Sequence, residues 1–212
     1  MTAFQELLTT QDELDGLYGP PMEAVTSKTI DHLDVHCREF IARSPFVLLA
    51  TADASGRCDV SPKGGPPGFV GIVDDHRLLI PDAPGNRRID SLRNVFENPQ
   101  IGLLFLIPSL EETLRVNGKV AIVRDEALLA ERELVGKPAK VGLGVEVEEA
   151  FLHCAKAFKR SGLWRPDEWQ SLDGLARPAE IWRDHMKLPG LTTEGVQDIL
   201  DDDYVNNLVW RS

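Results

Sequence analysis

Short apolar segments separated by turn-forming residues fill the middle of the chain, and this pattern limits the fold more than any other feature. Residues 46–51 form a dense apolar run, and the sequence DASG at 53–56 has the composition of a tight turn. Residues 57–61 are expected to return as a second strand, which predicts a β-hairpin. Residues 69–73, a turn at 74–76 and residues 77–80 predict a second hairpin.

Further strands and several helices are predicted around these hairpins. Residues 100–107, 114–123 and 141–147 are expected to be strands, and Asn86 is a favourable N-cap for a helix over residues 87–97 that ends before Pro99. The opening segment up to Gly19, residues 27–43 and residues 148–160 are predicted to be helical. Short strands with one inserted helix and helices at both ends predict a mainly β fold with flanking helices, of the α+β class, built on a small closed barrel.

The length of the chain is that of one domain. The 212 residues contain no internal repeat, low-complexity tract or long linker. We therefore predict a single domain over residues 1–212, with helical extensions at about residues 1–43 and 149–212.

Charge, cysteine usage and hydropathy argue against several classes of protein. The formal net charge of −11 disfavours nucleic-acid binding, which needs a broad basic surface. The three cysteines form no CxxC pair, which argues against a disulfide framework or a zinc ribbon. The N-terminus lacks the features of a signal peptide. No apolar stretch approaches the roughly 20 residues that span a bilayer. We expect a cytoplasmic protein that binds neither nucleic acid nor membranes. His32 and His36 have no third ligand nearby in the sequence and are predicted to be a surface pair, so no metal site is expected.

Residues 81–92, with the sequence PDAPGNRRIDSL, are the most informative segment for function. A strand is expected to end there, and a helix capped by Asn86 to begin with Arg87 and Arg88. The positive end of a helix dipole disfavours cations, so two arginines at this point suggest a bound anion, which guanidinium groups and helix N–H groups hold well. An exposed basic turn, with Asp90 offsetting the charge, explains the segment equally well.

A second basic residue, Lys63, lies one hairpin earlier within the sequence SPKGG. Its glycines allow a ligand to approach the backbone closely. Neither GxxxxGK[ST] nor GxGxxG is present, so the common nucleotide-binding loops are not predicted. Lys63 is expected to converge with Arg87 and Arg88 on one phosphate group.

These segments resemble the FMN-binding core of the pyridoxamine 5′-phosphate oxidase family. The resemblance covers about residues 42–123 and rests on LLATADASGRCDVSPKG, LLIPDAPGNRRIDSLRN, NPQIGLLF and TLRVNGKVAIV. It implies a split β-barrel of the FMN-binding type, FMN as the cofactor, and a homodimer with FMN at the subunit interface. DVSPKGG replaces the family enzyme's RxVLLK strand, and the family's C-terminal Arg/His segment has no match. The resemblance therefore implies FMN binding but not pyridoxamine phosphate oxidation itself.

The resemblance also implies which residues contact the cofactor. The strand at 60–63 would support the flavin ring and phosphate, residues 86–88 would clamp the phosphate, and Thr113 lies where the family often has a glutamine near the ring. The expected cofactor-binding residues are Val60, Ser61, Lys63, Ile80, Pro81, Asn86, Arg87, Arg88, Thr113, Arg160 and Trp164.

Two features carry alternative explanations. The sequence HCAKAFKRSGLW at 153–164 is similar to a segment of a bacterial branch of FMN-dependent proteins. In one interpretation, its basic helix with Arg160 and the Trp164 side chain close the flavin pocket, in cis or from a partner subunit. In the other, the helix is a solvated face and Trp164 is a packing residue. Arg115 and Asn117 alternate with apolar residues in a predicted strand, so they face either a polar pocket or water.

The expected function is an FMN-dependent oxidoreductase that acts on an unknown small molecule, since a bound flavin would carry the redox chemistry. No catalytic residue is assigned. The alternatives are a flavin-binding store or sensor without turnover, and a split barrel that holds deazaflavin or haem.

Overall fold

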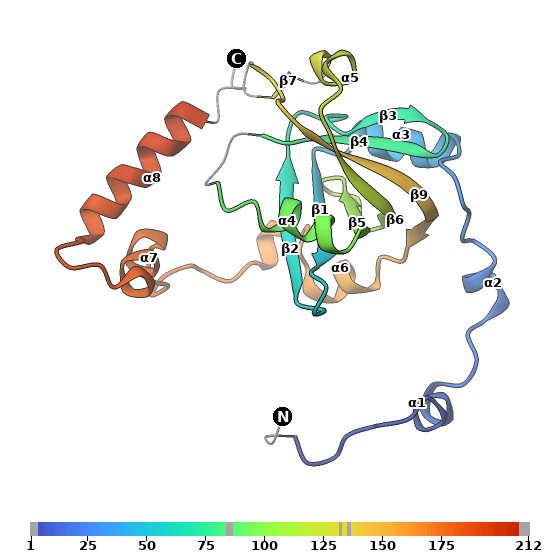
Figure 1. Cartoon of the computed structure of the whole chain (residues 1–212). Coiled ribbons are helices and arrows are strands. Elements are labelled where there is room, and N and C mark those ends of the chain that lie inside the picture. The colour runs from blue at the N-terminus through green and yellow to red at the C-terminus, as the bar shows by residue number, and fades with distance from the viewer. Residues whose placement is uncertain (1–3, 84–86, 132, 135–136, 208–212) are drawn as a thin grey trace.

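The computed structural model describes residues 4–83, 87–131, 133–134 and 137–207. Its main feature is a seven-stranded antiparallel sheet with the order β2-β1-β5-β6-β9-β4-β3, accompanied by the small pair β7-β8 (Figure 1). The strands are β1 Phe46–Ala52, β2 Cys58–Gly64, β3 Gly71–Asp74, β4 Arg77–Pro81, β5 Gln100–Leu106, β6 Thr113–Val123, β7 Glu133–Leu134, β8 Lys137–Pro138 and β9 Gly142–His153.

Helices lie at both ends of the chain and between strands. They are α1 Gln11–Tyr18, α2 Glu23–Thr26, α3 Val35–Arg43, α4 Asp90–Glu97, α5 Glu126–Ala130, α6 Lys156–Ser161, α7 Pro178–Met186 and α8 Thr193–Asn207, with a 3-10 turn at Pro166–Glu168. Within the described residues, none of these helices has the length and apolar character needed to cross a membrane.

The large sheet closes on itself as a split barrel. Strands β2 and β3 are its two edges, and residues 65–70 connect them directly. Lys63 near the end of β2 forms an ion pair with Asp82, which follows β4, at an Nζ–Oδ1 distance of 3.2 Å. Because β2 and β4 are far apart in the strand order, this contact requires the sheet to curl round. The predicted α+β class and the predicted closed barrel are confirmed.

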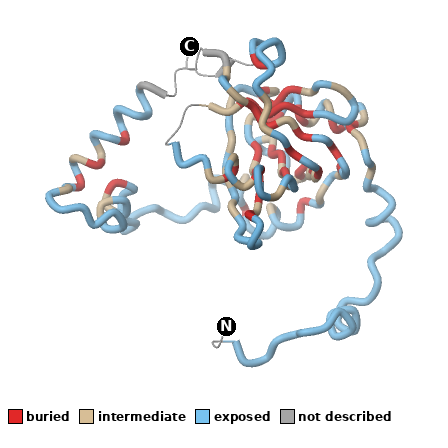
Figure 2. Tube along the Cα trace, in the orientation of Figure 1, coloured by how far each residue is buried: buried red, intermediate tan, exposed pale blue. Residues whose placement is uncertain are grey.

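The inside of the barrel is the hydrophobic core (Figure 2). Alternate residues of each strand point inward, and Val47, Leu49, Phe105 and Val116 are completely or almost completely buried. Helix α3 adds Ile41 to this core from outside the sheet. Most of the hydrophobic stabilisation therefore comes from the barrel and α3.

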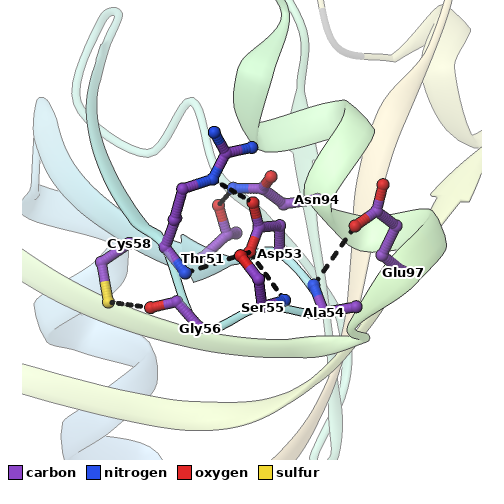
Figure 3. Close-up of polar contacts among 9 residues, drawn as sticks. Thr51, Asp53, Ala54, Ser55, Gly56, Cys58, Asn94 and Glu97 are labelled. Carbon is purple, nitrogen blue, oxygen red and sulfur yellow. Dashed lines mark hydrogen bonds and ion pairs between the residues drawn. The ribbon is translucent and has the colours of Figure 1, made fainter.

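The β1–β2 hairpin turns around the carboxylate of Asp53 (Figure 3). This carboxylate accepts hydrogen bonds from the backbone N–H groups of Ser55 at 2.9 Å and Arg57 at 3.0 Å. The Ser55 hydroxyl and the Arg57 guanidinium also donate to it, and these bonds hold the pKa of Asp53 well below its usual range. The hairpin predicted from the DASG sequence is confirmed, with a satisfied aspartate at its turn.

Helix α4 is attached to this same hairpin end (Figure 3). Asn94 donates to the Thr51 hydroxyl at 3.0 Å, and the Glu97 carboxylate accepts from the backbone N–H of Ala54 at 3.2 Å. Val95 faces the core from the same helix. The C-terminal part of α4 is therefore fixed against β1.

Helix α4 begins later than the sequence predicts. The predicted helix over residues 87–97 is wrong at its start, because α4 begins at Asp90 and its N-cap residue is Ile89. Arg87 and Ile89 have positive φ angles of 61° and 49°, which a right-handed helix does not permit. Asn86, the predicted N-cap, lies outside the described residues.

Two other predicted helices are also corrected. Residues 27–43 do not form one helix, because Ile30 makes a β-bridge with Ala150 and α3 begins only after Asp34, whose side chain caps it. Residues 148–153 are not helical, because β9 pairs with the whole length of β6 and continues to His153. The opening helix α1 starts at Gln11 after a capping box at Thr10.

The segments outside the barrel make little core of their own. Every described residue before Ile30 is exposed (Figure 2). Helices α7 and α8 pack against each other around Ala179, Val196 and Leu200, and they project from the barrel as a separate pair (Figure 1).

Gly118 lies at a point where the backbones of β6 and β9 approach each other closely. The pairing register shifts between Asn117 and Gly118, and a Cβ atom at Gly118 would lie 2.0 Å from the backbone oxygen of Glu146. Gly118→Ala is therefore expected to lower the free energy of unfolding by about 3 kcal/mol, measured by chemical denaturation.

Gly102→Ala on the neighbouring strand is the matched control. Its added Cβ would have the Asn117 side-chain oxygen at 3.4 Å as its nearest neighbour, so the change should stay within about 1 kcal/mol. Equal stability of the two variants would contradict the close approach of β6 and β9.

Candidate functional site

Residues on either side of 84–86, after β4, contact the edge strand β2 at two points. We call the described residues 82–83 and 87–91 the corner segment. At its start, Asp82 pairs with Lys63 of β2 at 3.2 Å, and at its end the Ser91 hydroxyl donates to the Asp59 carboxylate of β2 at 2.7 Å. Lys63 and the arginines of the corner segment therefore belong to one side of the barrel.

The alternation of β2 determines which of its residues face the corner segment. Asp59, Ser61 and Lys63 are half-buried, and they pair with the buried residues of β1, so they point to the inner face of the sheet. Val60 points to the opposite, outer face and is exposed. A ligand that contacts both Val60 and Ser61 must therefore lie along the free edge of β2.

The backbone of the corner segment is strained where it enters α4. Arg87 and Ile89 both adopt the left-handed conformation, which non-glycine residues rarely adopt and which is concentrated at functional sites. No described side chain caps the N-terminus of α4. Its first N–H groups carry partial positive charge, so this helix end favours an anion.

Cations outnumber carboxylates by one at this corner. The cations are Lys63, Arg87, Arg88 and Arg93, and the carboxylates are those of Asp59, Asp82 and Asp90. Arg88 pairs with Asp90, whose hydrogen bond and charge raise the pKa of that guanidinium. Among the residues that the structure describes, Arg87 has no ion-pair or hydrogen-bond partner. A phosphate bound here could interact with the Arg87 guanidinium and with Lys63 and Arg88, which Asp82 and Asp90 already hold in place.

Sequence reasoning identified Asp90 but missed Asp59, Asp82 and Ser91 of this corner. The sequence DVSPK in β2 places polar residues at every second position, and this period could have identified Asp59 as a neighbour of Ser61 and Lys63. Nothing local in the sequence indicates that Asp82 reaches across the barrel to Lys63.

The remaining expected residues lie at different depths. Ile80 is completely buried in the core and Pro81 is buried at the end of β4, so either would meet a ligand mainly through its backbone. Thr113, the first residue of β6, is also buried. Asn86 lies outside the described residues, and its expected role is not tested.

The C-terminal segment is anchored to the loop that precedes Thr113. The Trp164 indole N–H donates to the Leu110 carbonyl at 2.9 Å, and its ring stacks on Phe158 at a centroid distance of 5.7 Å. Lys159 pairs with Glu111 at 2.6 Å. Trp164 is therefore held near Thr113 by its own chain, whereas Arg160 is exposed on α6.

The outward-facing residues of β1, β2 and β5 form a continuous apolar surface. These strands are adjacent, and the paired residues Val60–Ala50, Pro62–Leu48 and Leu48–Leu104 share the outer face. An antiparallel sheet usually shows polar residues on its solvent-facing side. This outer apolar face, partly or fully exposed throughout, consists of Phe46, Leu48, Ala50, Val60, Pro62 and Leu104.

Metal binding receives no support from the described part of the chain. No group of three His, Cys, Asp or Glu side chains there is arranged to hold a metal ion. His32 precedes α3 and packs its ring 6.1 Å from that of His76, so His32 and His36 do not share one helix face.

Several solved structures are similar to the barrel part of this chain. HupZ of Group A Streptococcus has 19% identity and a TM-score of 0.47, over 56% of this chain and 92% of HupZ. An FMN-binding protein of Syntrophomonas wolfei has 13% identity and a TM-score of 0.43, over 55% and 88% of the two chains. HutZ of Vibrio cholerae, described as a haem storage protein, has 20% identity and a TM-score of 0.40, over 57% and 93%.

No curated protein matches the chain significantly. The family described as pyridoxamine 5′-phosphate oxidase matches residues 33–154, which is more than half of the chain and includes the barrel and the corner segment. The chain therefore belongs to the pyridoxamine 5′-phosphate oxidase family.

Proposed function

We propose that this protein is an FMN-dependent oxidoreductase that acts on a small molecule and binds the FMN phosphate at the corner between β2 and α4. The observation that carries the proposal is the attachment of the corner segment to β2 at both ends, through Asp82–Lys63 and Ser91–Asp59. This attachment supports one shared site for Lys63 and the arginines that precede α4, whose N-terminus has no side-chain cap.

The donor groups of the corner fit a phosphate monoester. Lys63 and Arg88 offer charged donors, Arg87 is unengaged within the described structure, and α4 contributes N–H groups. The three aspartates reduce the net attraction, but Asp82 and Asp90 also hold Lys63 and Arg88 in place before the ligand arrives, so less side-chain entropy is lost on binding. Asn86 would complete this clamp.

The flavin ring would lie along the free edge of β2. Val60 and Ser61 would then contact the ring from either side of that edge, and Ile80 and Pro81 would contribute backbone from the end of β4. Thr113 and the Trp164 segment, with Arg160, would close the far end of the site. When bound, FMN supplies the hydride and electron transfer, while these residues orient it and exclude water.

The outer apolar face supports a homodimer with FMN at the subunit interface. An exposed apolar surface of this kind on a soluble domain usually marks an interaction site, and a second copy of the chain offers the same surface for two-fold packing. Val60 belongs to this face and also borders the proposed ring position, so the interface would extend to the cofactor. The free cysteines suit a cytoplasmic protein.

Removing the two arginines of the corner tests the phosphate site. Arg87→Ala combined with Arg88→Ala should weaken FMN binding at least about tenfold, because charged hydrogen bonds contribute about 1.5–3 kcal/mol each. Riboflavin, which has no phosphate, should bind the double variant as well as the parent protein. Both affinities are measured by fluorescence titration.

Arg43→Ala provides the matched control for loss of charge. Arg43 is exposed on α3 and pairs with Glu39, away from the corner, so its removal should leave FMN affinity unchanged. Equal losses of FMN and riboflavin affinity in the double variant would contradict the phosphate assignment.

A charge on the outer apolar face tests the dimer. Val60→Glu should shift the protein from dimer to monomer in sedimentation equilibrium, because two-fold packing would bury two unpaired carboxylates. Val73→Glu on the other edge strand, β3, changes an equally apolar exposed residue outside this face and should keep the dimer. A parent protein that is monomeric at all concentrations would contradict the proposal.

Turnover distinguishes an oxidoreductase from a flavin store or sensor. When the FMN-loaded protein is mixed anaerobically with NADH or NADPH, the flavin absorbance should bleach within seconds and return when air is admitted. Bleaching no faster than that of free FMN with either nucleotide would favour storage or sensing over catalysis.

A further inference from the structure

A cluster of positive charge surrounds one aromatic ring on the outer face of β6 and β9. The Arg115 guanidinium carbon lies 5.4 Å from the centroid of the Phe151 ring, and the Lys28 ammonium lies 5.8 Å from the same centroid. The ring of His153, two residues along β9, is 6.4 Å from Phe151. Arg115 and Phe151 are directly paired across the two strands, so this part of the cluster is built on the sheet, whereas Lys28 lies in the turn before Ile30.

The two cations of this cluster are not neutralised within the described chain. Neither Arg115 nor Lys28 makes an ion pair with a described carboxylate, and Lys28 donates instead to the backbone oxygen of Leu152 at 2.7 Å. Glu149, the acidic residue two positions before Phe151, accepts a hydrogen bond from Asn117 at 3.0 Å. Both positive charges are therefore available to an anionic ligand.

His153 responds to the charge of this cluster. Its partial burial lowers the pKa of the imidazole below its ordinary value, and the positive charges of Arg115 and Lys28 lower it further. His153 is therefore neutral at pH 7, and it offers a neutral donor or acceptor between two cations.

The partial burial of Arg115 and its contact with Phe151 strengthen its attraction for an anion. Arg115 is half-buried, so less water screens its charge than at a fully exposed site. Cation–π contacts with Phe151 fix the guanidinium and leave its donor edge available. The cluster is thus arranged before a ligand binds.

We propose that Arg115, Lys28 and His153 form a second anion-binding subsite, on the outer face of the sheet, for a phosphate or carboxylate group of a small molecule. This subsite is distinct from the corner, because Lys63 and Asp59 point to the inner face whereas Arg115 points outward. It adjoins Thr113, which pairs directly with His153 and lies at the far end of the proposed FMN site. It gives the protein a preference for acidic small molecules.

The side chain of His153 reports directly on the occupant. Its NMR signals are followed against pH in the full-length protein while inorganic phosphate replaces chloride at constant ionic strength. Phosphate should raise the pKa of His153 toward its ordinary value in a saturable manner, because a bound anion offsets the two neighbouring cations. A parallel titration with acetate distinguishes the source: a response to phosphate alone indicates a phosphate-bearing ligand, and a response to acetate indicates a carboxylate.

Variants connect that response to the named residues. Arg115→Gln and, separately, Lys28→Gln should each weaken phosphate binding about tenfold, while Arg115→Lys should retain part of it. Lys28 is exposed and outside the barrel, so its variant tests the subsite even if Arg115→Gln does not fold. The Arg87→Ala, Arg88→Ala double variant should keep the full response, which separates this subsite from the phosphate corner.

Two results would overturn the proposal. One is a His153 pKa that neither phosphate nor acetate changes at constant ionic strength. The other is a dimer that dissociates in Arg115→Gln while the parent protein shows no phosphate response, which would mean that a carboxylate of a second copy already neutralises the cluster.

Discussion

The contact between Lys63 and Asp82 joins the edge strand β2 to the end of β4, and it ties Lys63 to the segment that leads to Arg87 and Arg88. Each side chain is only about a quarter exposed, at 24% and 23%, so the pair is less screened than a surface ion pair. Ser91 repeats the attachment at the other end of the corner segment by donating to Asp59. The two contacts together tie the segment that carries Arg87 and Arg88 to β2.

The electrostatics of the corner are balanced and not simply basic. Three aspartates accompany the cations, and Asp82 and Asp90 hold Lys63 and Arg88 in defined positions. A phosphate has to compete with these carboxylates, which lowers affinity, but it meets donors that are already arranged. The left-handed backbone at Arg87 and Ile89 is consistent with such an arrangement, since strain of this kind persists only where the surroundings stabilise it.

The barrel was predictable from the sequence because its signals are local. Apolar runs, the DASG turn and the strand alternation of residues 114–123 each identify an element from a few neighbouring residues. The errors arose where distant contacts decide the structure. Residues 148–153 have a plausible helical composition, but they continue β9 because β6 offers a partner strand along its full length.

The candidate site was predictable in part for the same reason. The arginine pair and Lys63 carry a local signal, namely cations beside glycine-rich turns, whereas Asp59 and Asp82 join the corner only through the closure of the barrel. The Phe151 cluster likewise combines Lys28, Arg115 and His153 from three segments. Arg115 alone, in an alternating strand, fits either a polar pocket or a solvent-exposed face, and its pairing with Phe151 is a long-range contact that the local sequence does not indicate.

FMN binding is tested most directly by the visible absorption spectrum of the protein purified without added cofactor, together with the mass of the molecule that heat releases. The protein should show the two-band spectrum of an oxidised flavin and release a molecule with the mass of FMN. A haem or deazaflavin spectrum, or protein that remains colourless after incubation with FMN and gel filtration, would contradict FMN as the cofactor.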